Sequence, residues 1–107
     1  MPRLQQQLET LLKLAVQAEY QPGKLATLAG CTPWQLRRKL LRLVGCSTRV
    51  FLRRLRIKHA EAKLLSSSWV KEIAPEICFK HSASLCRWFK KEKGVPITQF
   101  LKTTADQ

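Results

Sequence analysis

Apolar residues recur at intervals of three and four along most of the chain, which is the spacing of an amphipathic helix. The first such segment predicts a helix from about residue 3 to residue 19, and a short helix is expected over residues 24–29. Gly30 ends the short helix, because glycine adopts the left-handed conformation of a helix C-terminus without strain.

Thr32 and Pro33 predict that a longer helix begins directly after this turn. Threonine accepts a hydrogen bond from free backbone N–H groups, and proline at the first helical position loses no bond that the helix would make. The helix is expected to run to Gly45. Its inward stripe consists of Leu36, Leu40 and Leu43. Two helices joined by a three- or four-residue turn with glycine form a helix-turn-helix.

The second half of the chain repeats this arrangement. Ser47 or Thr48 caps a long helix that ends near the serines at 66–68, and further helices are expected over residues 70–77, 81–93 and 96–102. No segment has a strand pattern. The sequence therefore predicts an all-α fold of about seven helices, with two helix-turn-helix subdomains joined by a long central helix. The expected parts are residues 1–45 with the N-terminal helix, 46–67 as the connecting helix, and 68–107 with a polar tail.

The distribution of positive charge indicates which kind of partner the protein binds. The 107 residues include 20 Lys and Arg against 7 Asp and Glu, a net charge of +13, and no acidic residue occurs between Glu19 and Glu61. A solvated basic face is one explanation, but so long a block favours a polyanion partner. An anionic membrane surface is disfavoured, because we expect other helices to cover the apolar stripe of residues 50–65, which includes Leu65.

The other sequence features exclude several classes of function. We interpret Cys31, Cys46, Cys78 and Cys86 as reduced, buried structural thiols, since no CxxC pair or finger spacing is present. There is no nucleophile with a recognisable base, no glycine-rich phosphate loop and no metal pattern, so we expect neither an enzyme nor a cofactor. No apolar run approaches the roughly 20 residues that cross a bilayer, which predicts a soluble cytoplasmic protein.

Three motifs resemble the DNA-binding domain of the AraC/XylS family of bacterial transcription regulators. They are LATLAGCTPWQLRRKLLRLVGC, FLRRLRIKHAEAKLL and IAPEICFKHSASLCRWFKKEKGVPITQF, and the resemblance runs from about Leu25 to Phe100. It implies two helix-turn-helix subdomains that bind double-stranded DNA in adjacent major-groove segments, at the nucleoid. Family members most often activate transcription and also contact RNA polymerase. They usually carry a separate effector or dimerisation domain, so this chain is a stand-alone regulator or a fragment.

The resemblance also implies two recognition helices. In the first, over residues 32–43, the DNA-facing positions are Trp34, Arg37 and Arg38, and further candidates are Thr32, Gln35 and Arg42. In the second, over residues 82–93, the corresponding positions are Ser82, Ala83, Ser84, Cys86 and Arg87, with Lys90 as a further phosphate anchor.

Side-chain chemistry assigns different roles to the two helices. Arg37 and Arg38 are able to donate two hydrogen bonds to guanine O6 and N7, although either arginine is equally able to bind phosphate alone. Trp34 is expected to be exposed, because leucines already fill the inward stripe. The second helix has short side chains apart from Arg87, so it is expected to anchor phosphates more than to contact bases.

Several residues depart from the family pattern. Cys78 replaces the glycine of the second turn, Pro75 lies inside the short helix and invites a kink, and Leu40 replaces a phenylalanine. Trp69 and Trp88 are expected at the core or its boundary. Two alternative functions stay open: a nucleic-acid binder without sequence preference, and a protein-interaction module that self-associates through the N-terminal helix.

Overall fold

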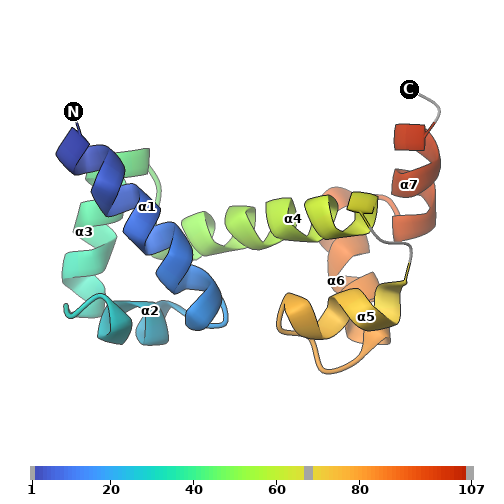
Figure 1. The fold of residues 1–107 in the computed structure, drawn as a ribbon, viewed down its shortest axis with the longest axis horizontal. Helices are drawn as coiled ribbons and strands as arrows, with labels where there is room; N and C mark the ends of the chain where they lie inside the picture. Colours follow the sequence, from blue (N-terminus) through green and yellow to red (C-terminus); the bar gives the residue numbers. More distant parts are fainter. Residues whose placement is uncertain (1, 67–68, 106–107) are drawn as a thin grey trace. The chain divides into compact units, whose positions relative to one another are not determined.

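The computed structural model describes residues 2–66 and 69–105, and this part of the chain contains helices without any strand (Figure 1). The helices are α1 (Pro2–Gln17), α2 (Pro22–Leu28), α3 (Pro33–Val44), α4 (Thr48–Ser66), α5 (Val70–Glu76), α6 (Ser82–Lys93) and α7 (Ile97–Ala105). The predicted all-α fold with about seven helices is confirmed. Contacts divide the chain into a first unit, residues 1–56, and a second unit, residues 57–107, and α4 continues through the boundary.

The core of the first unit draws on four helices. In this unit α2 contacts both α1 and α3. The fully or nearly fully buried side chains are Leu11, Ala15, Ala18, Tyr20, Leu25, Ala26, Leu36, Leu40, Phe51 and Leu52. Burial of this apolar surface, at roughly 25 cal/mol per Å², is what fixes α3 against its neighbours. Leu40 is completely buried, so the exchange from phenylalanine at this position is accommodated within the core.

The ends of α3 are formed by the residues that the sequence indicated. The Thr32 side chain accepts a hydrogen bond from the Gln35 backbone N–H at 3.2 Å, and the Gln35 side chain accepts one from the Thr32 backbone N–H at 3.0 Å. This capping box and Pro33 define the first turn, and Gly45 ends the helix in the left-handed conformation with φ 74°. The start of α3 is therefore held rigidly.

The second unit has its own core, built around α5 and α6. Its buried residues are Ala60, Leu64, Ile73, Ala74, Ile77, Leu85, Phe89 and Ile97. Phe89 packs edge-on against Phe100 of α7, with 5.3 Å between the ring centroids. On the surface, the Lys93 ammonium lies 2.7 Å from the Glu61 carboxylate and so connects α6 to α4. The second core thus combines aliphatic side chains with the Phe89–Phe100 ring pair.

Cys78 and Pro75 show how the second turn is made without glycine. Cys78 itself adopts the left-handed conformation, with φ 66°, where the first turn uses Gly30 with φ 74°. Helix α5 continues through Pro75 and ends one residue later at Glu76. The N–H groups of Cys78 and Phe79 then bond back to the carbonyls of Pro75 and Ala74, closing the turn. Cys78 therefore adopts the turn conformation itself, in place of the glycine of the family pattern.

Four expectations about burial and boundaries were wrong. Trp69 is 67% exposed because it precedes α5 in extended backbone, while Ile73 and Ala74 fill the core positions of that helix. Leu65 is 56% exposed because Leu64, one residue earlier, is the side chain that points inward. Cys86 is exposed, whereas the other three thiols are partly buried. Helix α2 begins at Pro22, two residues before the expected start at residue 24, because Pro22 occupies the first helical position.

Candidate nucleic-acid interface

A stripe of long side chains covers the face of α3 opposite its buried leucines. Trp34, Arg38 and Arg42 follow one another at intervals of four and are exposed, and Trp34 is 62% exposed, as predicted. Arg37 lies on one flank of this stripe and Gln35 on the other, and both are exposed. Because the core leucines fix the rotation of the helix, these side chains project from a rigid support.

Trp34 and Arg38 contact one another within the stripe. The Arg38 guanidinium carbon lies 4.8 Å from the centre of the Trp34 ring, a cation–π distance. Such a contact contributes roughly 0.5 to 1 kcal/mol at an exposed site. It therefore restricts the freedom of Arg38 before any ligand binds.

Thr32 and Gln35 have only part of their hydrogen-bonding capacity available for a ligand. The Gln35 carbonyl oxygen and the Thr32 hydroxyl oxygen both accept backbone N–H groups in the capping box. Gln35 keeps the two donors of its amide nitrogen, and Thr32 keeps its hydroxyl hydrogen. Both residues are thus donors toward a ligand, which suits an anion or the acceptor atoms of a base edge.

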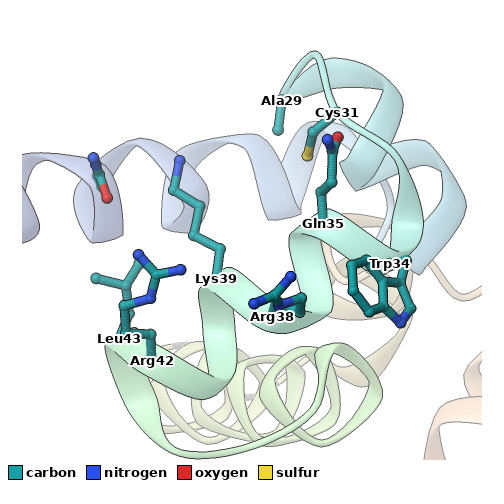
Figure 2. Close-up of a pocket in the computed structure, with 9 residues that line it drawn as sticks. Ala29, Cys31, Trp34, Gln35, Arg38, Lys39, Arg42 and Leu43 are labelled. Atoms are coloured by element: carbon teal, nitrogen blue, oxygen red, sulfur yellow. The ribbon is translucent and has the colours of Figure 1, made fainter.

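An open groove of about 470 Å³ runs along the flank of α3 that faces α1 (Figure 2). Figure 2 shows Lys39 extending from α3 toward α1, and Gln35 lying beside Cys31. The lining residues are Gln7, Ala29, Cys31, Trp34, Gln35, Arg38, Lys39, Arg42 and Leu43. Gln7 and Lys39 are both partly buried and were not predicted as site residues. Helical periodicity could have indicated Lys39, but nothing in the sequence pairs Gln7 with α3.

The cations of α3 are not neutralised by any carboxylate that the structure describes. Across residues 6–66 and 69–103, ion pairs do form elsewhere, between Lys24 and Glu19 at 3.6 Å and between Lys63 and Glu76 at 3.2 Å. Within those same residues, no carboxylate pairs with Arg37, Arg38, Lys39 or Arg42. The helix therefore presents four positive charges that an external anion is free to neutralise.

The exposed face of α6 is narrower and carries fewer donors. Ala83, Cys86, Arg87 and Lys90 are exposed at intervals of three and four, opposite the buried Leu85 and Phe89. Ser82 and Ser84 are partly buried on the flanks of this stripe. Trp88 is partly buried and packs against Phe79 at 5.1 Å, so it lies at the core boundary as predicted. Arg87 and Lys90 are the two charges that this stripe offers.

Arginine and lysine are divided unevenly between the units. Eight of the nine arginines lie in residues 1–56, and eight of the eleven lysines lie in residues 57–107. Arginine presents a planar fork that matches guanine or phosphate with two bonds, whereas lysine is a compact point charge. The first unit is therefore the better equipped for directional recognition.

Other kinds of site find less support in the part of the chain that the structure describes. Residues 2–66 and 69–105 contain no group of three His, Cys, Asp or Glu placed to hold a metal ion. None of their helices is both long and apolar enough to span a bilayer. Burial lowers the pKa of His59 below its ordinary value of 6.5, and the positive charge of Lys63 lowers it further.

Two turn-linked helix pairs, each with a buried apolar stripe and an exposed basic one, define a helix-turn-helix protein of the DNA-binding class. The family model described as "Helix-turn-helix domain" matches residues 25–103. The chain therefore belongs to this family of AraC-type helix-turn-helix domains, and the predicted resemblance is confirmed. It is a DNA-binding transcription regulator. No curated protein and no solved structure matches the chain.

Proposed function

We propose that this regulator binds double-stranded DNA sequence-specifically, with α3 in the major groove. The observation that carries the proposal is the stripe of Trp34, Arg38 and Arg42, whose arginines pair with no acidic residue in the described part of the chain and whose helix starts in a capping box. The major groove is about 12 Å wide and admits one helix, so a rigid helix with long donors is suited to it.

The arginines at the centre of α3 are the proposed base contacts. Arg38 projects opposite the core and is oriented by Trp34, so its fork is positioned for guanine O6 and N7. Arg37 lies beside it and is the second candidate for a base contact. Trp34 supplies an apolar ring for a thymine methyl group or a sugar. Arg42, Thr32 and the Gln35 amide complete this surface with contacts to phosphate or to an adjacent base.

The second helix-turn-helix is proposed to anchor the complex. Arg87 and Lys90 would bind phosphates from an adjacent major-groove segment about 34 Å away, while Ser82, Ala83, Ser84 and Cys86 contribute close packing against the backbone. Residues 46–67 serve as the connector between the two helix-turn-helix subdomains, 1–45 and 68–107. Activation of transcription through contact with RNA polymerase, at the nucleoid in the cytoplasm, completes the proposal and is supported by the family alone.

The test is selection of bound duplexes from a random pool, followed by titration of the selected duplex and a scrambled control at 50 and 200 mM salt. Six to ten phosphate contacts would lower affinity for both duplexes by about 10³ to 10⁵ over this range. We expect one well-defined sequence element, bound by α3. Equal affinity for selected and scrambled DNA would overturn the proposal in favour of binding without sequence preference.

A further inference from the structure

The groove between α1 and α3 is lined by hydrogen-bond donors. Six of its nine lining side chains carry N–H groups, from Gln7, Trp34, Gln35, Arg38, Lys39 and Arg42, and none of the nine is acidic. The carbonyl oxygen of Gln35 already accepts the Thr32 backbone N–H, whereas both donors of its amide nitrogen remain available to a ligand. A site composed in this way matches a ligand that only accepts hydrogen bonds and carries negative charge.

The position of the groove along α3 indicates which anion would reach it. An α-helix with its side chains is about 10 to 12 Å across and the major groove about 12 Å wide, so a helix in that groove has a phosphate strand close to each flank. Gln35 and Lys39 lie on the flank of α3 that faces α1, beside the stripe proposed to contact bases. A strand passing along this flank would meet the opening between the two helices.

We propose that this groove binds one phosphodiester of the DNA backbone and that α1 is part of the DNA interface. Lys39 supplies the charge, and the amides of Gln7 and Gln35 donate to the phosphate oxygens. This inference rests on the proposed insertion of α3 in the major groove. It assigns a role to Gln7, which lies outside the family match that begins at residue 25, and it gives α1 a role other than the self-association that the sequence left open.

The site is tested with the selected duplex carrying single methylphosphonate linkages, each of which removes one phosphate charge and leaves the bases unchanged. For the wild-type protein we expect one linkage beside the element bound by α3 whose neutralisation weakens binding by about tenfold, the value of one charge-assisted contact. In Lys39→Ala and Gln7→Ala the same linkage should cost less than about twofold. Lys13→Ala is the matched control, because Lys13 is exposed on α1 and does not line the groove.

A second pair of variants tests the groove by changing its charge and leaves the length of the side chain unchanged. Gln7→Glu places a carboxylate in the groove and should weaken binding to every duplex, whereas Gln17→Glu makes the same charge change at the other end of α1 and should not. Circular dichroism and thermal melting establish that each variant is folded. Wild-type sensitivity at every linkage in Lys39→Ala, or equal losses in the two glutamate variants, would overturn the inference.

The experiments distinguish a groove that binds no phosphate from a protein that does not bind DNA sequence-specifically. If the wild-type protein prefers no duplex, sequence-specific binding fails, and the groove is then judged by salt dependence on random DNA. There Lys39→Ala should reduce the slope of log affinity against log salt by about 1, while Lys13→Ala leaves it unchanged. Equal slopes for the two lysine variants would reject the groove as a phosphate site.

Discussion

Replacing Trp34 with alanine removes the ring on which the Arg38 guanidinium rests, 4.8 Å from the ring centre. An exposed cation–π contact contributes about 0.5 to 1 kcal/mol, which corresponds to roughly a two- to fivefold weaker Kd if the orientation of Arg38 is lost. Arg38→Ala removes the proposed guanine contact itself. A good bidentate pair contributes about 1 to 3 kcal/mol, so binding to the selected duplex should weaken roughly 5- to 150-fold.

A double-mutant cycle separates orientation of Arg38 from direct contact by Trp34. Affinities for the selected duplex are measured by fluorescence anisotropy for the wild type, both single variants and the double variant. We expect Trp34→Ala to cost several-fold less in the Arg38→Ala background, because there is then no guanidinium to orient. Trp34→Phe should retain part of the effect, and random DNA should respond weakly. Strict additivity of the two substitutions would refute the orienting role of Trp34.

Three further predictions address anchoring, turn strain and pH. Lys90→Ala should weaken binding to selected and random duplexes alike and reduce the salt slope by about 1, and a loss confined to the selected duplex would contradict phosphate anchoring. Cys78→Gly should raise the free energy of unfolding by about 1 kcal/mol, since Cys78 has φ 66°. Gly30→Ala at φ 74°, in open space, should lower it similarly, and unchanged denaturation midpoints would contradict both. The pKa of His59 is below 6.5 in the folded chain, so the unfolded chain takes up a proton first and stability should fall as the pH falls below about 6.5. Denaturant titrations at pH 7.5 and 5.5 check this, and His59→Gln should remove part of the difference.

The sequence predicted the helices well because their ends are determined locally. Thr32, Pro33 and Gly45 act through the hydrogen bonds and backbone angles of their own turns, and each takes the predicted part in α3. The observed helix boundaries differ from the predicted ones by one to three residues. The differences occur where one residue is compatible with two interpretations. Pro22 illustrates this, because proline either stops a helix or occupies its first position.

Features that depend on tertiary contact were less accessible from the sequence. Trp69 and Leu65 were assigned to the core by their residue type, yet neighbouring apolar residues fill the available positions. The approach of Gln7 to α3 joins segments with no common periodicity, so only the packed structure brings them together. The use of the Gln35 carbonyl as a cap, which leaves both donors of its amide nitrogen available, was likewise visible only from the geometry.

On α3, the buried residues that support the helix are separate from the exposed residues proposed to contact DNA. This separation affects how the regulator acquires new operators. Leu36 and Leu40 pack α3 against the core, whereas Trp34, Arg37 and Arg38 are exposed on its surface. Surface substitutions of this kind usually alter stability by no more than about 0.5 kcal/mol. The proposed target preference can therefore change or be re-engineered at these three positions while the fold is kept. Gln35 is the exception, since changing it also removes half of the capping box.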